Sequence, residues 1–203
     1  REEITMTKFR LLSSAICLLC AFSSAATAAE YEIDGAHTQI TFKVRHLGIS
    51  WVPGSFSKLE GKFSFDKNNI AASKAEAKID VASVNTLNQK RDDHLRGEDF
   101  FHAEKHPTIT FVSKEVKPLK GDSFKVIGDL TMHGVTKTVE LDAEFTGAAT
   151  DPWGNEKIAF SATTKLNRKD FGLQWSKVLE TGALVVGDEV VISLDMQGTK
   201  KKS

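Results

Sequence analysis

Residues 40–46 read ITFKVRH, and in this stretch apolar side chains alternate with polar or charged ones. A period of two places the apolar side chains on one face of a β-strand and the polar side chains on the other. The same kind of segment returns further along the chain, so the sequence predicts strands over most of its length. These further segments are residues 63–65, 75–81, 108–112, 124–132, 138–145, 158–166 and 189–196.

Short stretches rich in glycine, asparagine and aspartate separate the predicted strands, as is typical of turns. Eight or nine strands joined in this way favour an antiparallel meander. Because a flat sheet exposes its edge strands to aggregation, we expect the meander to close into an eight-stranded β-barrel. The predicted fold class is therefore all-β, with a single domain over residues 30–203. The turn signals are residues 66–69, 120–122, 133–134 and 151–154.

Residues 85–107 interrupt the strand pattern. Residues 88–96 read NQKRDDHLR, which shows no alternation and contains several good helix formers. Asn85 or Thr86 is predicted to cap the start of a helix, and Gly97 is predicted to end it in a left-handed turn. We expect this helical insertion to lie near one end of the barrel.

Residues 1–29 have the pattern of a cleavable leader. Lys8 and Arg10 precede an apolar run over residues 11–22, and Ala26-Thr27-Ala28 fits a signal-peptidase site. The apolar run is too short to span a bilayer, so no stable membrane insertion is expected. Both cysteines, Cys17 and Cys20, lie in this leader, which leaves the mature domain without disulfides or thiolate metal sites.

Charge and histidine content narrow the function classes further. The chain carries 27 basic and 27 acidic residues, so no nucleic-acid-binding surface is indicated. His102 and His106 stand four residues apart, but the intervening residues do not form the zinc motif H-E-x-x-H. The favoured interpretation is that the histidines are surface or hydrogen-bonded residues, with no metal site and no cofactor; a metal site is the weaker alternative. The other histidines, which fall in separate segments, are His37, His46, His94 and His133.

No nucleophile elbow, phosphate-binding loop or dinucleotide fingerprint is found in the sequence. One enzymatic alternative remains, in which His94 and Asp92 act as an acid–base pair on an amphiphile. In the non-enzymatic interpretation, Arg91 and His94 lie at the mouth of the barrel and contact a polar head group, since arginine suits phosphate through its fork of donors.

Aromatic residues are spread over most of the predicted strands. Side chains that fill a closed barrel and side chains that line a hollow one give the same sequence pattern, so periodicity leaves both alternatives open.

Several motifs, taken in order, resemble the YceI-like family. They include DGAHTQITF at residues 34–42, HLGISW at 46–51, RDDHLR at 91–96 and GDLTMHGVTK at 128–137. KDFG at 169–172 and VGDEV at 186–190 complete a resemblance that runs from about Tyr31 to Met196.

This resemblance implies a periplasmic protein with an extended, lipocalin-like barrel that binds a polyisoprenoid or another long-chain amphiphile, with no chemistry done on it. A filled stress-response barrel without a ligand is the second alternative, and a homodimer is compatible with the sequence. The expected mouth residues are Trp51, Arg91 and His94. The expected tunnel lining is Phe42, Val44, Phe56, Phe63, Phe111, Leu130, Phe160 and Trp175.

Overall fold

Strands occupy most of the chain in the computed structural model, which describes residues 28–180, 182 and 184–202. One α-helix, α1 (Gln89–Arg96), and the short 3-10 helices η1 (Ile70–Ala72), η2 (Val81–Ser83) and η3 (Arg168–Phe171) interrupt the strands in this part of the chain. Apart from Ala28 and Ala29, the predicted leader lies outside the described residues. The strands are β1 (Ala29–Ile33), β2 (Gln39–His46), β3 (Ser50–Phe56), β4 (Leu59–Phe65), β5 (Lys74–Asp80), β6 (Val84–Asn85), β7 (Thr108–Pro118), β8 (Ser123–Met132), β9 (Val135–Thr150), β10 (Glu156–Asn167) and β11 (Val186–Lys200).

The strands close into an eight-stranded antiparallel barrel, which confirms the predicted fold class. Hydrogen bonds run in the order β1-β4-β5-β7-β8-β9-β10-β11, and β11 pairs back with β1. Every predicted strand segment overlaps an observed strand. Closure leaves these strands without a free edge along the ring.

The long strand β11 holds two short strands end to end along one of its sides. β1 pairs with its last residues and β2 pairs with the stretch from Val186 to Asp195. β3 then pairs with β2, and β6 pairs with the end of β3. Sequence alternation did not predict β3, because Pro53 and Gly54 break it. β3 tolerates Pro53 because Pro53 pairs with β2 alone.

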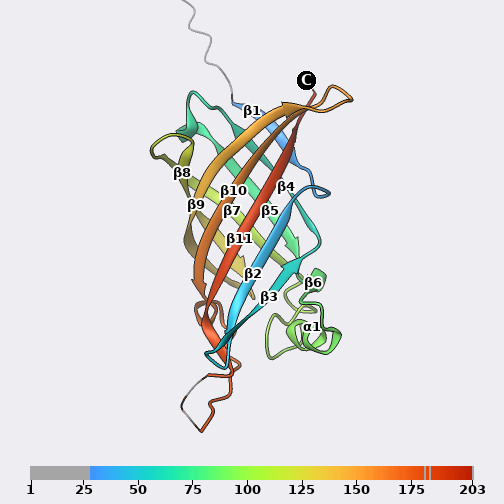
Figure 1. Ribbon diagram of the computed structural model, residues 1–203, viewed down its shortest axis with the longest axis vertical. Coiled ribbons are helices and arrows are strands. Elements are labelled where there is room, and N and C mark those ends of the chain that lie inside the picture. The colour runs from blue at the N-terminus through green and yellow to red at the C-terminus, as the bar shows by residue number, and fades with distance from the viewer. Residues whose placement is uncertain (1–27, 181, 183, 203) are drawn as a thin grey trace, which may run out of the picture.

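The barrel is elongated and its two ends differ (Figure 1). At the end that carries β1 and the C-terminus, here called the β1 end, a packed aromatic cluster fills the interior. At the opposite end, here called the α1 end, α1 and the loop after it lie against the barrel. A second small core at the α1 end joins that loop to η3 through Phe100, Phe171 and Leu173.

The predicted helix is present, but both of its ends differ from the prediction. Asn88 is the N-cap, and its side chain accepts a hydrogen bond from the backbone N–H of Arg91 at 3.1 Å. Asn85 lies in β6 instead, because Ser55 pairs with it across the sheet. Gly97 ends the helix with φ −71°, which is not the left-handed conformation predicted for it. A left-handed glycine cap would satisfy the free carbonyls of the last helical turn. Here the turns after the helix do so instead, as in the hydrogen bond from the N–H of Ala103 to the carbonyl of Arg96.

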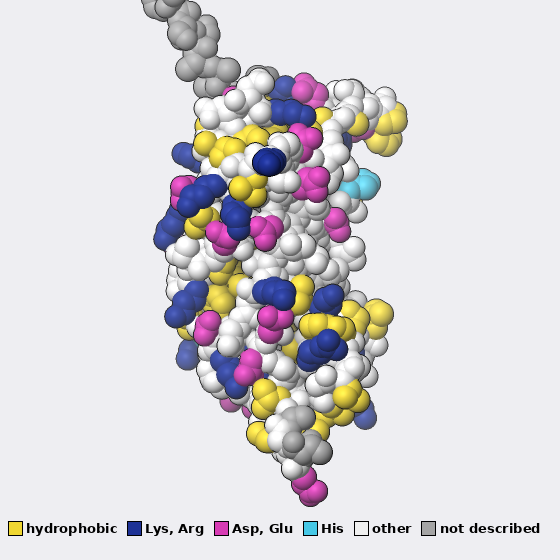
Figure 2. All heavy atoms as spheres, turned by 60° about the vertical axis from the view of Figure 1, so that its left-hand side comes forward, with side chains coloured by type: hydrophobic (Ala, Val, Ile, Leu, Met, Phe, Trp, Pro, Cys, Tyr) yellow, Lys and Arg dark blue, Asp and Glu magenta, His cyan; other side chains and the backbone are white. Residues whose placement is uncertain are grey.

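Charged side chains of both signs alternate over the outer face of the barrel, and Figure 2 shows them interspersed on one side. Many form ion pairs between neighbouring strands, such as Lys114 with Asp129 at 2.7 Å and Lys78 with Glu60 at 3.0 Å. In the described residues, no helix is both long enough and apolar enough to cross a membrane.

Candidate functional site

An apolar cavity of about 190 Å³ lies inside the α1 end of the barrel. Its walls come from strands β2, β3, β5 and β7 to β11, and the loop after α1 contributes Phe100 and Phe101. Among the lining residues only Thr164 and Arg168 are polar, so a bound molecule would meet hydrocarbon on nearly every side. This cavity is called the larger cavity below.

A smaller cavity of about 110 Å³ continues the interior toward the β1 end, among the aromatic side chains there. The two cavities meet at four side chains that line both, namely Ala77, Phe111, Leu141 and Leu194. The two cavities therefore lie next to each other in one apolar interior, with these four residues between them.

Seven of the eight predicted lining residues line the two cavities, whereas Trp175 lines neither. Phe42, Val44, Phe56, Phe111 and Leu130 line the larger cavity, whereas Phe63 and Phe160 line the smaller one, which Phe111 also borders. The five residues of the larger cavity keep part of their surface accessible although they point inward. Phe63 and Phe160 are only 5% and 7% exposed. Inward-facing side chains retain accessible surface only where nothing fills the space before them, so the barrel is hollow at the α1 end and nearly filled at the β1 end.

Three glycines on the barrel wall give room to phenylalanine rings. A methyl group added at Gly54 would lie 2.3 Å from the ring of Phe42, and one added at Gly128 would lie 2.5 Å from the ring of Phe111. Gly198 stands in the same relation to Phe63, at 2.2 Å. Each ring therefore lies against the wall on a neighbouring glycine, rather than reaching across the axis.

Arg168 is a charged group in the wall of the larger cavity, and it is only 4% exposed. Its guanidinium donates hydrogen bonds to the carbonyls of Gly187, Leu173 and Val186 and contacts Asp188 at 3.3 Å. Desolvation lowers the pKa of Arg168, and the carboxylate of Asp188 opposes that shift. These partners use the hydrogen-bond donors of the guanidinium. Arg168 therefore connects η3 to the start of β11, and its guanidinium is not available to bind a molecule in the cavity.

Trp175 and His94 lie beside the α1 end of the larger cavity. The His94 ring is 5.0 Å from the ring of Phe100 and 5.1 Å from that of Trp175, measured between centroids. Since Phe100 lines the cavity, His94 and Trp175 form a layer behind its wall.

The structure places the other two predicted mouth residues differently. Trp51 packs under Arg45 at 4.2 Å and Lys43 at 5.1 Å, on the outer face of β2 and β3, because it shares the alternation of the outward-facing residues. Arg91 donates hydrogen bonds to the hydroxyl and the carbonyl of Thr86, at 2.7 and 2.8 Å, and so connects α1 to the chain before it.

Asp92 and His94 make separate contacts. Asp92 is buried and accepts hydrogen bonds from the backbone N–H and the hydroxyl of Thr86, at 2.8 and 2.5 Å. His94 pairs through Nε2 with Asp99 at 2.8 Å. Residues two apart on a helix face different directions, so the two side chains do not form the acid–base pair of the enzymatic alternative.

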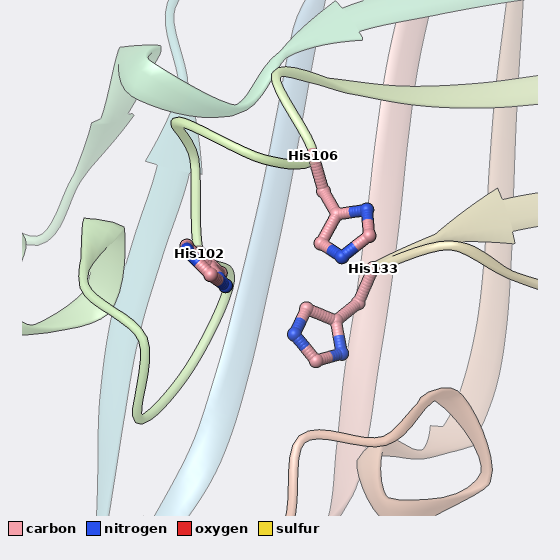
Figure 3. A group of neighbouring side chains, drawn as sticks. All are labelled: His102, His106 and His133. Carbon is pink, nitrogen blue, oxygen red and sulfur yellow. The ribbon is translucent and has the colours of Figure 1, made fainter.

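Three histidines gather at the α1 end, as Figure 3 shows. One ring nitrogen of each of His102, His106 and His133 lies within 4.8 Å of those of the other two. Desolvation lowers the pKa of His106, and the neighbouring groups of His133 and Lys105 lower it further, which favours the neutral imidazole.

In the sequence, His133 falls in a segment separate from the other two histidines, and strand pairing brings the three together. Thr110 of β7 pairs with Thr131 of β8, so the residues before β7 face the residues after β8. The hairpin turn at residues 120–122 was predicted. Pairing the two strands about that turn would have placed His106 near His133.

The comparisons with known proteins agree on one family. The family model of the YceI-like domain matches residues 31–198. A UPF0312 protein of Vibrio cholerae is 44% identical over 169 residues, which cover 82% of this chain and 89% of that protein. A UPF0312 protein of Vibrio vulnificus is 42% identical over 193 residues, covering 94% of this chain and 98% of that protein.

Solved structures show the same architecture. The Campylobacter jejuni YCEI protein is 37% identical, covers 83% of this chain and 96% of its own, and superposes with a TM-score of 0.67. BcnA of Burkholderia cenocepacia is 25% identical, with coverages of 81% and 98% and a TM-score of 0.72. A polyisoprenoid binding domain from Saccharophagus degradans is 16% identical, with coverages of 86% and 99% and a TM-score of 0.62, and shows the fold alone. On the family model and the curated relatives together, this chain belongs to the YceI-like family.

Proposed function

We propose that this protein binds a long, apolar chain, such as that of a polyisoprenoid or a quinone, inside its barrel and carries it without chemical change. The hollow α1 end supports this proposal most directly. Five inward-facing side chains keep accessible surface around a cavity of about 190 Å³ whose lining is almost wholly apolar.

The physical gain is the removal of hydrocarbon from water. Each buried CH₂ group contributes about 0.8 kcal/mol, so even a short buried chain can offset the cost of immobilising it. Hydrocarbon walls discriminate weakly between chains of similar width, and we therefore expect binding to depend on chain length more than on chemical detail.

The α1 end is the proposed entrance. The opposite end is blocked by aromatic contacts such as Phe65 with Phe160, at 4.9 Å between ring centroids. At the α1 end the larger cavity is covered by Leu95, Phe100 and Phe101 from α1 and the loop after it. A displacement of this loop would admit a chain and leave a polar head group near His94.

A periplasmic location completes the proposal. The leader-like residues 1–29 support it. For the ligand, further support comes from the fold, which this protein shares with the polyisoprenoid binding domain from Saccharophagus degradans. Cell fractionation should recover the protein in the periplasmic fraction, shortened at its N-terminus.

The experiment that tests the binding proposal is mass spectrometry of organic extracts from natively purified protein, combined with uptake of farnesol and longer polyprenols. A co-purified long-chain molecule is the expected result. Leu130→Trp, which adds volume inside the larger cavity, should weaken uptake on the order of tenfold, since excluding two buried CH₂ groups costs about 1.6 kcal/mol.

Val112→Trp is the matched control, because Val112 is 49% exposed on the outside of β7. It should leave uptake unchanged. An extract without any lipid, together with no uptake of any polyprenol, would end the proposal and favour the filled barrel.

A further inference from the structure

We propose that His102, His106 and His133 form a binding site for a divalent transition-metal ion, best suited to Zn²⁺, at the α1 end of the barrel. Two of the three residues follow α1 in the chain, and the third lies in the turn between β8 and β9. One ring nitrogen of each lies within 4.8 Å of the other two, and the rings point toward one another (Figure 3).

The tautomer of His133 suits a metal ligand. Its Nδ1 lies 3.2 Å from the carbonyl oxygen of Phe171, which can only accept a hydrogen bond. This hydrogen bond requires the proton on Nδ1, and in the neutral tautomer with that proton the lone pair of Nε2 is free to bind a metal ion. Metal-bound histidines commonly donate their second N–H to a backbone carbonyl in this way, which orients the ring and raises its basicity.

The backbone holds all three histidines firmly. His133 and Gly134 form a tight two-residue hairpin with φ of +53° and +76°. The backbone N–H of His106 donates a hydrogen bond to the carbonyl of His102 at 2.9 Å. The backbone N–H of His102 donates to the carbonyl of Gly97, also at 2.9 Å. His102 has φ +48°. A left-handed conformation is costly for a non-glycine residue, and such strain clusters at binding sites.

Two glycines leave room for the rings. A methyl group at Gly134 would lie 2.8 Å from Cε1 of His106, and one at Gly172 would lie 3.0 Å from Nδ1 of His133. Both glycines have φ near +80° in any case, so a side chain would be strained at either position as well as crowding the histidines.

The ligand set points to the kind of ion. Neutral imidazoles suit Zn²⁺, Cu²⁺ and Ni²⁺, whereas Mg²⁺ and Ca²⁺ prefer oxygen ligands. Tetrahedral bonds of about 2.0–2.1 Å bring ligand nitrogens to roughly 3.3 Å from one another, so the rings must close by a small rotation. The carboxylate of Glu98, which is exposed and 4.0 Å from Nε2 of His102, can approach as a fourth ligand in place of water.

The site would link two parts of the α1 end. His102 follows Phe101 and His133 follows Met132, and both of these neighbours line the larger cavity. A bound ion would therefore fix the loop after α1 to the β8–β9 turn beside the cavity.

Zn²⁺ titration of chelator-treated protein that carries no polyhistidine tag tests this inference. Isothermal titration calorimetry should show one ion bound per chain, Zn²⁺ should raise the Tm, and Mg²⁺ should do neither. His133→Ala and His102→Ala should each weaken Zn²⁺ binding by on the order of 100-fold or more, since even the loss of an outer hydrogen bond costs about 10–100-fold.

His46→Ala is the matched control, because His46 is exposed at the end of β2, in a different segment from the cluster. It should leave Zn²⁺ affinity unchanged. His133→Ala can also lower the Tm of the metal-free protein, so the rise in Tm caused by Zn²⁺ is measured for each variant relative to its own metal-free Tm. His133→Gln keeps more of the side-chain volume, and loss of the Zn²⁺-induced rise in this variant as well would identify His133 as a ligand rather than a packing residue. Zn²⁺ binding that is absent, or equally strong in His102→Ala and His133→Ala, would overturn the inference whether or not the barrel binds lipid.

Discussion

At the scale of single residues, Asp34 shows how a family motif serves the fold. It follows β1, and its carboxylate accepts hydrogen bonds from Lys157 at 2.8 Å and from Gln197 at 3.4 Å. His37 contacts it at 3.0 Å. One carboxylate therefore joins the first strand to β10 and β11, near the place where the barrel closes.

The first prediction concerns the pH dependence of this contact. The hydrogen bond from Lys157 lowers the pKa of Asp34 from 3.8 to about 2. A carboxyl group whose pKa is lowered by folding stabilises the protein above its unfolded pKa and loses that effect as the pH falls through the folded value. Asp34→Asn should therefore lower the free energy of unfolding by about 2 kcal/mol at pH 7.

Urea denaturation at a series of pH values measures this effect. The difference between the natural chain and Asp34→Asn should shrink as the pH falls from about 4 to about 2. Asp195→Asn is the control, because Asp195 is exposed on β11, and it should have little effect at any pH. A difference that stays constant down to pH 2 would contradict the ion-pair explanation.

At the scale of elements, η3 and the start of β11 depend on one buried arginine. Arg168 reaches three backbone carbonyls and a carboxylate with a single guanidinium. Nothing in the sequence distinguishes it, because an arginine followed by a lysine and an aspartate is typical of an ordinary charged turn.

Arg168→Lys should destabilise the protein by about 3 kcal/mol or more. A lysine ammonium lacks the planar fork that satisfies several acceptors at once, and it leaves buried carbonyls without donors. Thermal or chemical denaturation measures the loss. Lys165→Met, which removes only an exposed ion pair with Glu189, should change stability by less than about 1 kcal/mol. An equal loss of stability in the two variants would show that the hydrogen bonds of Arg168 do not stabilise the contact between η3 and β11.

At the scale of the whole molecule, the length of the bound chain depends on whether the two cavities join. Phe111 lines both and lies against Gly128. Phe111→Ala should open the boundary between them and shift the preference in uptake toward longer polyprenols, at a cost in stability of about 3 kcal/mol.

Phe56→Ala is the appropriate comparison, since Phe56 lines the larger cavity away from this boundary. It should reduce stability to a similar degree without changing the preference for chain length. Competition between polyprenols of different length measures this preference. An unchanged preference in Phe111→Ala would mean that the smaller cavity takes no part in binding.

Local signals in the sequence were sufficient for much of the fold and for part of the site. Alternation located the strands from β2 to β11 that obey it and identified Phe42, Val44, Phe111 and Leu130 as inward-facing. It missed β3, where Pro53 interrupts the pattern, and β1, which is short. Trp51, expected at the mouth, instead pairs with Arg45 on the outer face of β2 and β3, a position that depends on the pairing of these two strands.

The sequence alone determined that this chain is all-β, that its strands each have an apolar face, and that one helix interrupts them. Only the tertiary structure decided that the α1 end is hollow and that His133, from a distant segment, meets His102 and His106 beside it. The physical reason is that alternation specifies the direction of a side chain but not what stands opposite. The opposite residue follows from strand register and barrel closure, which place Phe42 on Gly54 and His106 beside His133.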